Sequence, residues 1–451
     1  MTDHQPRPEE PLQRRVPPYA ILIAVIAAIG GLLFGYDTSV ISGAILFVRK
    51  RFALTSFETE LAVSVVLAGA ALGAAMAGYL SDRFGRRPAL LVNATIFGVF
   101  AIITGLANGL PLFLAARFLV GVAIGVTSMI TPLYIAELAP SSIRGALVTL
   151  NQLAIVTGIV VAYYVDYLFS RSGNWRAMFI SAVIPSILLL IALIFLPESP
   201  RWLATHGQFD DARKVLERVE NPEEVQRNLA ELGNVAATDR LAFRDLFAPR
   251  FRKPLVVGIG LAIFQQITGV NTIIYYTPTI LQMGGYHSAS TAILATVLVG
   301  AVNFGATIVS LFLLDRVGRR PLLLAGIAGM TFGLADLGYS FGVRHVSPAT
   351  VLLDVVIYLA SFAISLGPVF WLLISEIYPT TVRGQAMSLA TVTIWLADLL
   401  VSITFLSMVA AFGARASFWA YGGACVVAFA FSLKLVPETK DRTLEQIEAS
   451  W

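Results

Sequence analysis

Five polar side chains lie close together in a stretch of the chain that is otherwise apolar. Gln265 and Gln266 are adjacent, Asn271 follows about a turn and a half later on a helix, and Tyr275 and Tyr276 come next. A buried amide that lacks a hydrogen-bond partner costs about 1–3 kcal/mol, and hydrocarbon offers no water to supply one. These groups are therefore suited to bind a polar ligand. The alternative is that they join neighbouring helices, which is worth roughly 0.6–2 kcal/mol for each hydrogen bond.

A carboxylate and an arginine occur at similar depths in two other apolar stretches. Asp37 lies roughly 13–15 Å from the end of its stretch, and Arg117 lies roughly 9 Å from the end of another, at about 1.5 Å per helical residue. A carboxylate at the centre of a membrane costs at least about 2.5–3.5 kcal/mol, so it is a candidate functional group by default. The two depths predict that Asp37 pairs with Arg117, and a purely structural ion pair is the alternative.

The composition predicts that these residues are held by an integral membrane protein. Of the 451 residues, 57% are hydrophobic and 13% are charged, whereas soluble domains carry about 25% charged residues, and the mean hydropathy is +0.77. The net charge is only +4 and the basic residues cluster at the ends of apolar runs, so we expect a lipid bilayer and no nucleic acid as partner. The single cysteine, Cys425, excludes an internal disulfide, and the four scattered histidines suggest no metal site.

About twelve apolar stretches are long enough to cross a bilayer, which takes roughly 20 residues for each helix. The first stretch is too long for a cleavable signal peptide, and no cleavage site follows it. We therefore predict an all-α membrane protein with about twelve transmembrane helices. The expected spans are Tyr19–Phe47, Glu60–Leu80, Pro88–Asn108, Pro111–Glu137, Ala146–Phe169, Trp175–Leu196, Pro254–Gln282, Thr291–Leu314, Pro321–Gly342, Thr350–Ile377, Gln385–Phe412 and Ser417–Val436.

The second half of the chain repeats the first. Three pairs of segments match at offsets of roughly 235–240 residues: Gly78–Pro88 with Leu313–Pro321, Leu133–Pro140 with Leu372–Pro379, and Pro197–Ser199 with Pro437–Thr439. Two parallel six-helix repeats describe a secondary transporter with a binding site between its halves. The predicted parts are an N-terminal tail (1–18), a first bundle (19–200), a linker (201–253), a second bundle (254–436) and a C-terminal tail (437–451). Charges of alternating sign at helical spacing predict short cytoplasmic helices in the linker.

Arginine and lysine residues lie mainly on one side of the predicted membrane, which by the positive-inside rule is the cytoplasmic side. The run Arg49–Arg51 falls on the opposite side and is the main exception. We expect both termini in the cytoplasm. The short first outer loop and the single cysteine favour a bacterial inner membrane.

These motifs together resemble the sugar porter family of the major facilitator superfamily. The resemblance rests on the paired D-R-x-G-R-R loops, the paired E-x-x-P…R-G turns, the run P-E-S-P-R-W-L, the segment Q-Q-x-x-G-x-N-x-x-x-Y-Y and the terminal P-E-T-K. It covers nearly the whole chain, from Gly35 to Glu448. It implies the major facilitator fold, with two pseudo-symmetric six-helix bundles, and transport of a monosaccharide, either a hexose or a pentose.

The resemblance also implies roles for individual residues. Asp37 and Arg117 fall at its proton-coupling positions, where facilitative members usually carry a neutral residue in place of the aspartate, so it implies proton symport. A facilitative uniporter stays the alternative, and a non-transporting sugar sensor is less favoured because the tail is short. Tyr275 and Tyr276 fall at an outer gate. Sugar contacts are implied for Gln152, Gln265, Gln266, Asn271, Asn303, Gly367, Trp371 and Trp395.

Alternatives exist for some of these roles. Asn303 could equally be a helix-joining amide, and the two tryptophans could belong to an interfacial belt. Two residues depart from the usual pattern: Ile394 stands where an amide is common, and Asp398 where an asparagine is usual. Asp398 could be a second titrating group or a structural, hydrogen-bonded acid, and both departures leave the sugar undefined.

Matched charges at the cytoplasmic helix ends of both halves form a further set. We expect them to make a latch between the halves that closes the cytoplasmic side, and membrane orientation alone is the alternative. The set comprises Asp82, Arg86, Arg87, Glu137, Arg144, Asp315, Arg319, Arg320, Glu376 and Arg383.

The sequence contains no motif that indicates an enzyme. The chain contains no P-loop motif and no G-x-S-x-G motif, which disfavours ATP-driven pumping and serine-based hydrolysis. We therefore expect a transporter that is not an enzyme, uses no cofactor beyond the proton as coupling ion, and works as a monomer.

Overall fold

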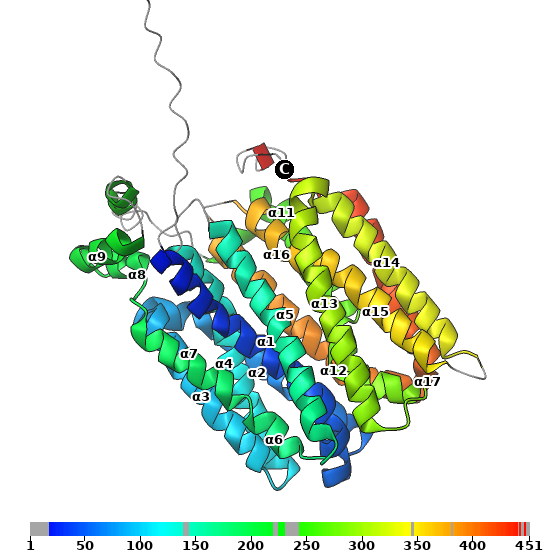
Figure 1. Ribbon diagram of the computed structural model, residues 1–451. Coiled ribbons are helices and arrows are strands. Elements are labelled where there is room, and N and C mark those ends of the chain that lie inside the picture. Colours follow the sequence, from blue (N-terminus) through cyan, green and yellow to red (C-terminus); the bar gives the residue numbers. More distant parts are fainter. Residues whose placement is uncertain are drawn as a thin grey trace, which may run out of the picture.

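The computed structural model describes residues 18–138, 144–219, 224–230, 243–343, 347–379 and 382–440, together with 442 and 446–447. The side chains of residues 18–28, 144–149, 219, 243 and 315 lie outside this description. The described part of the chain is helical and contains no strand. Its long helices run side by side as two groups, α1–α7 and α11–α17 (Figure 1).

The helices follow the order that the sequence predicts. The first group consists of α1 (Pro18–Phe52), α2 (Ser56–Phe84), α3 (Arg86–Leu106), α4 (Leu110–Leu138), α5 (Arg144–Ser170), α6 (Trp175–Ile180) and α7 (Val183–Phe195). Between the groups lie α8 (Pro200–Thr205), α9 (Phe209–Val219) and two 3₁₀ turns, η1 (Phe243–Phe247) and η2 (Pro249–Phe251). The second group consists of α11 (Arg252–Ile267), α12 (Val270–Met283), α13 (Ala289–Val317), α14 (Arg319–Ser340), α15 (Pro348–Ile364), α16 (Leu366–Ile377) and α17 (Arg383–Leu435).

The prediction of about twelve spans is confirmed with one qualification. Eleven helical segments of the described chain are long and apolar enough to cross a membrane. The last of them, α17, has 53 residues and contains Gly413 in a non-helical conformation with φ of 80° and ψ of 159°. Because a glycine tolerates positive φ, the chain changes direction there, and α17 supplies two spans.

The basic run that contradicted the orientation rule has a local explanation. α1 continues past the predicted end at Phe47 to Phe52, so that Arg49, Lys50 and Arg51 form its last turn. Cations near a helix C-terminus interact favourably with its exposed carbonyl groups and its dipole. These three side chains therefore complete a helix end, which is a reason for their presence that is independent of membrane orientation.

Close glycine contacts hold the first group together. On α4, a Cβ atom added to Gly121 would collide with the backbone of Val66 on α2, and one added to Gly125 would collide with the backbone of Ala70. Small residues at such crossings let membrane helices approach closely, where packing replaces the hydrophobic effect as the source of association. The α2–α4 pair is therefore a rigid unit behind the site.

Two membrane spans of the second group are each interrupted near the predicted site, so that α11 and α12 form one span and α15 and α16 form another. Gly269 has φ of +93° and separates α11 from α12, and the hydroxyl of Tyr358 donates to the carbonyl of Thr268 at 2.9 Å. In the same way, Ser310 Oγ donates to the carbonyl of Ile364 at 2.9 Å, where α15 gives way to α16. Broken helices are tolerated in a membrane where side chains satisfy the freed backbone groups, and they commonly line a substrate site.

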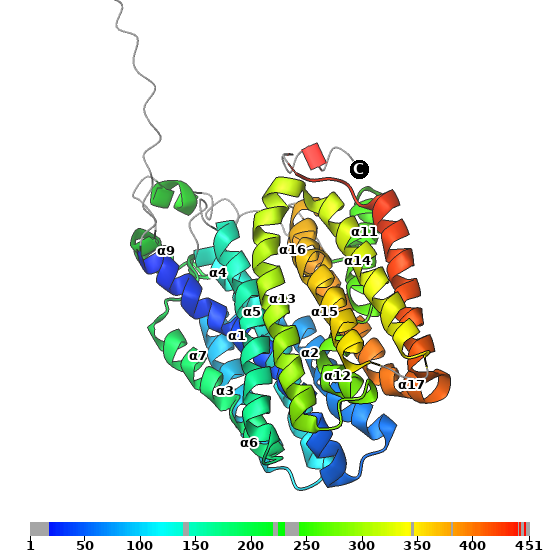
Figure 2. The same ribbon diagram turned by 45° about the vertical axis from the view of Figure 1, so that its right-hand side comes forward.

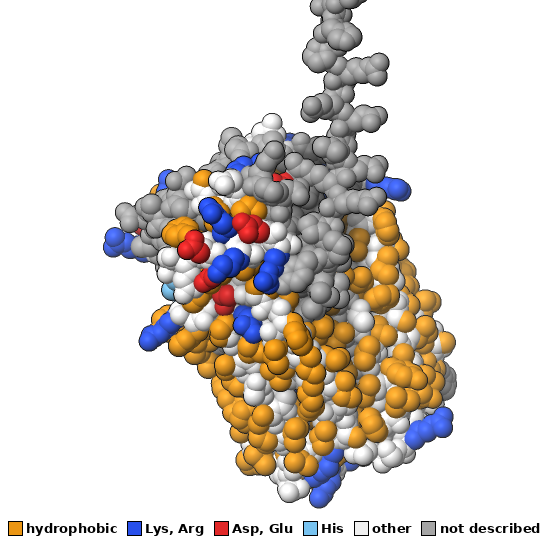
Figure 3. Space-filling model, turned by 60° about the vertical axis from the view of Figure 1, so that its left-hand side comes forward, with side chains coloured by type: hydrophobic (Ala, Val, Ile, Leu, Met, Phe, Trp, Pro, Cys, Tyr) orange, Lys and Arg blue, Asp and Glu red, His pale blue; other side chains and the backbone are white. Residues whose placement is uncertain are grey.

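The outside of the bundle suits a lipid environment. Figure 3 shows a flank covered by hydrophobic side chains, with charged side chains gathered mainly at one end. That end carries α8 and α9 (Figure 1), and α17 ends there as well (Figure 2). We call it the basic end, because Arg86, Arg87, Arg319 and Arg320 begin helices there.

Candidate functional site

Asp37 and Arg117 form a buried ion pair between α1 and α4. The Arg117 Nη1 to Asp37 Oδ1 distance is 2.5 Å, and both side chains are nearly inaccessible to solvent. The predicted pairing is therefore present. Among the described residues, Asp37 Oδ2 and the Nε and Nη2 atoms of Arg117 have no hydrogen-bond partner. The guanidinium lies 5.5 Å from the ring centre of Phe179 on α6, a distance typical of a cation–π contact.

The pair borders a cavity between the two halves. Its lining includes Asp37, Arg117 and Phe34 from the first half and Tyr275 and Trp395 from the second. The Trp395 ring meets the Phe34 ring edge-on, with 5.4 Å between the ring centres. The ionisable pair and two of the residues expected at the sugar site and its gate thus share one cavity.

The two glutamines at the end of α11 are buried, and their side-chain amides have different partners. Gln265 Nε2 lies 3.5 Å from the carbonyl oxygens of Leu366 and Gly367, at the start of α16. Gln266 Oε1 and Trp395 Nε1 are buried without a hydrogen-bond partner among the described residues. A buried amide acceptor and an indole donor that lack partners are polar groups available to a ligand.

Asn271 and Tyr275 of α12 both bind Asp398 of α17. Asn271 Nδ2 donates to Asp398 Oδ2 at 2.5 Å, and the Tyr275 hydroxyl donates to the same oxygen at 3.0 Å. Ser402 Oγ donates to the other carboxylate oxygen, also at 3.0 Å. Asp398 is therefore hydrogen-bonded on both carboxylate oxygens, and its roles as a structural acid or as a second titrating group both stay predictions.

The remaining predicted residues occupy different surroundings. Gln152 on α5 is half-buried and Asn303 on α13 is buried. Trp371 on α16 is 38% exposed, far more than the 5% of Trp395. Tyr276 turns toward α17, where its hydroxyl donates to the Ser402 carbonyl at 3.3 Å. Sugar binding by these residues, and the gate role of the tyrosines, stay predictions.

The halves are joined at the end opposite the basic end. Glu60, at the start of α2, is fully buried and accepts hydrogen bonds from the backbone N–H of Ser407 at 2.6 Å and from its hydroxyl at 2.5 Å. Ser170 at the end of α5 hydrogen-bonds Ser290 on α13 at 2.9 Å. Access to the cavity from this end is therefore blocked by direct contacts between the bundles.

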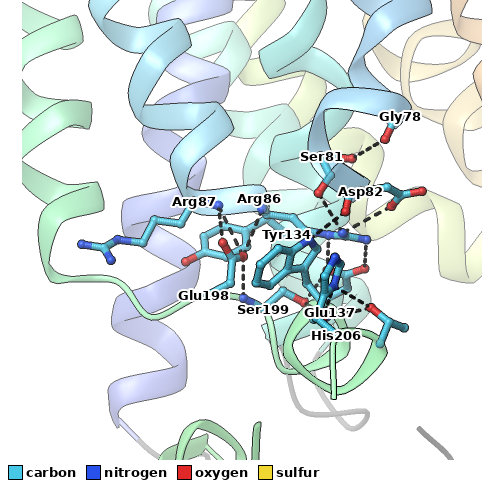
Figure 4. A network of polar contacts seen from close by, with 12 residues as sticks. Gly78, Ser81, Asp82, Arg86, Arg87, Tyr134, Glu137, Glu198, Ser199 and His206 are labelled. Carbon is cyan, nitrogen blue, oxygen red and sulfur yellow. Dashed lines mark hydrogen bonds and ion pairs between the residues drawn. The ribbon is translucent and has the colours of Figure 1, made fainter. Parts of the chain in front are cut away.

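At the basic end, a polar cluster in the first half surrounds Arg86 (Figure 4). Arg86 donates two hydrogen bonds to the carboxylate of Glu137, at 2.9 and 3.0 Å. Glu137 also accepts from Ser199 Oγ at 2.5 Å. Glu198 accepts from the backbone N–H of Arg86 at 3.0 Å, so it caps the start of α3. Arg87 donates to the last carbonyl groups of α7.

The second half repeats this cluster. Arg319 pairs with Glu376 at 3.0 Å, and Glu376 accepts from Thr439 Oγ1 at 2.5 Å. Glu438 accepts from the backbone N–H of Arg319 at 3.0 Å and so caps α14, while Arg320 donates to the carbonyl of Leu433 near the end of α17. The repeated motifs of the sequence therefore form the same arrangement twice, an arginine–glutamate pair beside a second glutamate that caps a helix, which we call a helix-end brace.

The two capping glutamates differ in their electrostatics. Burial raises the pKa of Glu198, although hydrogen bonds from the backbone of Ser199, Arg86 and Arg87 oppose it. Burial also acts to raise the pKa of Glu438, but backbone hydrogen bonds outweigh it and the pKa is lowered.

The described contacts of the charges expected to form a latch stay within each half, and the latch between the halves stays a prediction. The contacts described for Arg86, Arg87 and Glu137 join helices of the first half, and those for Arg319, Arg320 and Glu376 join helices of the second. Arg86 also pairs with Asp82 at 3.3 Å within the first half, and Arg383 Nε donates to the carbonyl of Tyr378 in the second. The side chains of Arg144 and Asp315 lie outside the described residues. Spacing placed the charges at helix ends, but it did not show that each arginine meets the glutamate of its own repeat.

The sequence reasoning missed three buried acids, which are Glu60, Asp166 and Asp354. Besides Glu60, Asp166 on α5 is fully buried and accepts from the backbone N–H of Gly43 at 3.0 Å. The signal was available, since a carboxylate within an apolar stretch marks a candidate functional group. Glu60 stands at the start of a predicted span, where a charged residue is expected, and its burial becomes evident only from the contact with α17.

Comparison with known proteins places this architecture in a family. The chain matches the family described as sugar (and other) transporter over residues 23–451. The chain belongs to this family. The D-xylose-proton symporter of Escherichia coli (strain K12) is 37% identical over 485 residues, covering 96% of each chain. The galactose-proton symporter of the same organism is 38% identical over 433 residues, covering 94% of this chain and 93% of the relative.

A solved structure is similar over nearly the whole chain. The inward open conformation of the E. coli xylose transporter XylE is 35% identical, with a TM-score of 0.84, and covers 96% of this chain and 100% of that one. The predicted sugar porter resemblance and the major facilitator fold are thereby confirmed.

Proposed function

We propose that this protein is a secondary active transporter that takes up a monosaccharide together with protons by alternating access. Its relatives include symporters named for D-xylose, galactose and arabinose with the proton. The observation that carries the proposal is the buried Asp37–Arg117 pair on the same cavity as Trp395 and Tyr275. A hexose or a pentose is the substrate class.

The ion pair supplies the proton site. Arg117 neutralises Asp37 while the carboxylate is ionised, and Asp37 Oδ2, which has no partner among the described residues, is the oxygen that accepts the proton. Protonation removes the charge that holds Arg117, so the contact between α1 and α4 weakens. Because a ligand shifts a conformational equilibrium only through its differential affinity, proton and sugar together favour the opposite-facing state.

The sugar lies between the halves. Gln265, Gln266 and Asn271 offer amide groups to its hydroxyls, and Trp395 offers an apolar face to its C–H groups. Gln152, Asn303, Gly367 and Trp371 complete the contacts, with Tyr275 and Tyr276 as the gate. The protein acts as a monomer in the plasma membrane of a bacterium, with both termini in the cytoplasm, so the Glu60–Ser407 contact closes the outer side.

Uptake into proteoliposomes tests the proposal. With an inward proton gradient, we expect the protein to concentrate labelled D-xylose, D-glucose or D-galactose, and we expect a protonophore to abolish the concentration. Asp37→Asn should retain exchange of sugar but lose accumulation against a gradient. Asp354→Asn is the matched control, since Asp354 is equally buried but accepts its hydrogen bond from Ser340, away from the cavity. Undiminished accumulation by Asp37→Asn would contradict the proposed coupling, and absence of uptake for every monosaccharide would contradict sugar transport.

A further inference from the structure

Asp398 gathers three hydrogen-bond donors from two helices. Asn271 and Tyr275 of α12 share Oδ2, at 2.5 and 3.0 Å, and Ser402 of α17 binds Oδ1 at 3.0 Å. Asp398 is 1% exposed. An ionised carboxylate only accepts hydrogen bonds, so every partner must turn a donor toward it. Three such donors satisfy most of its acceptor capacity without a cation.

This arrangement fixes which way Asn271 faces. A side-chain amide has a carbonyl oxygen on one branch and an NH₂ group on the other. With Nδ2 held by Asp398, the two branches cannot exchange places unless the shortest hydrogen bond of the cluster is broken. The Oδ1 branch of Asn271 is therefore the one left for a ligand.

We propose that Asp398 is a positioning residue that determines sugar specificity. It holds Asn271 so that the amide presents a hydrogen-bond acceptor, and a sugar hydroxyl at the facing carbon is selected because it donates. The inference rests on the proposed sugar transport and extends it. A chain of hydrogen bonds then runs from the sugar hydroxyl through Asn271 to the carboxylate, and each link polarises the next.

The same carboxylate connects the sugar to the gate. Tyr275 donates to Asp398 Oδ2 and lines the cavity that holds Asp37 and Arg117. A ligand that binds Asn271 is therefore linked through the Asp398 carboxylate to Tyr275, which lines the same cavity as the ion pair.

An asparagine at this position would behave differently. Its amide carries both a donor and an acceptor, so Asn271 could bind it in either orientation and present either branch to a sugar. Asp398→Asn should therefore relax the requirement for a donating hydroxyl without a change in side-chain size. An aspartate in place of the usual asparagine at position 398 thus selects sugars that carry a donating hydroxyl at the facing carbon.

Paired sugar analogues test the inference. A deoxyfluoro sugar can accept a hydrogen bond weakly but cannot donate one, whereas a deoxy sugar can do neither. We would measure competition by the deoxy and deoxyfluoro derivatives of D-glucose, D-galactose and D-xylose, at each ring carbon, against uptake of the labelled parent sugar. The carbon that faces Asn271 is the one whose penalty disappears in Asn271→Ala. There, both analogues should bind the wild type about tenfold or more weakly than the parent, because an acceptor is left unpaired.

The Asp398→Asn variant is then compared with the wild type in the ratio of competition by the deoxyfluoro and deoxy analogues. In Asp398→Asn, we expect the deoxyfluoro analogue at that carbon to compete several-fold better than the deoxy analogue, while the ratio stays near one in the wild type. Ser402→Ala removes one donor from Asp398 without freeing Asn271, so it should keep the wild-type ratio. The same ratio in Asp398→Asn and the wild type overturns the inference. If Asp398→Asn keeps the wild-type ratio and loses only proton-driven accumulation, the inference is also overturned, and Asp398 is a coupling group. If the wild type transports none of the parent sugars, the proposed function itself fails.

Discussion

At the scale of the residue, the pairing of Asp37 with Arg117 followed from sequence because both ends of each apolar stretch could be located and depth is proportional to residue number. The partners of the arginines at the basic end could not be obtained in this way. Arg86 meets Glu137 because α3 begins directly after the turn at Gly85, where φ is +98°, and its first residue lies beside the end of α4. Asp398 was recognised as unusual, but two of its donors, Asn271 and Tyr275, lie on α12, and the position of α12 depends on the break at Gly269.

Replacing one partner of the Asp37–Arg117 pair should lower the stability of the protein more than replacing both. Arg117→Met leaves the Asp37 carboxylate buried and unpaired, a change that costs about 3–5 kcal/mol in comparable pairs. The double variant Asp37→Asn/Arg117→Met carries no charge at this position, so we expect it to melt at a higher temperature than Arg117→Met. Thermal unfolding of the detergent-purified protein measures the difference.

The control for this pair is an arginine on the surface. Arg83→Met, at the exposed end of α2, should change stability by no more than about 0.5 kcal/mol. A double variant that melts no higher than Arg117→Met would mean that the charge on Asp37 is not what destabilises the single variant.

At the scale of the element, apolar length alone located the spans, because the membrane imposes a fixed thickness on every helix. The breaks were harder to predict. Gly269 and Gly413 adopt positive φ and interrupt helices, whereas Gly121 lies within α4 at a close contact. Glycine is common in membrane helices for both reasons, and only the tertiary contacts distinguish a hinge from a crossing point.

Two glycine substitutions should have opposite effects. Alanine is favoured over glycine within a helix by about 0.5–1 kcal/mol. Gly121→Ala should nevertheless destabilise the protein, because its methyl group would meet the backbone of Val66 and force α2 from α4. Gly423→Ala on α17 meets nothing within 4 Å and should be neutral or stabilising. Melting temperatures and yields of monodisperse protein compare the two, and equal effects would contradict the packing described for α2 and α4.

At the scale of the whole molecule, the internal repeat predicted two bundles, and matched helix-end braces now explain why the repeated motifs are alike. Each brace stiffens one bundle, and the Glu60–Ser407 contact joins the bundles at the other end. The sequence could not reveal this contact, because its partners are separated by most of the chain and belong to different repeats. Two internally braced bundles that can rock against each other are what alternating access requires.

Proton movement driven by sugar tests the central claim most directly. Proteoliposomes containing a pH-sensitive dye, without an imposed proton gradient, would receive a downhill gradient of D-xylose, D-glucose or D-galactose. For a transported sugar, we predict that the wild type acidifies the lumen and that Asp37→Asn does not, although both proteins carry the sugar inward. Sugar entry by the wild type without a change in luminal pH would contradict the account and identify the protein as a uniporter.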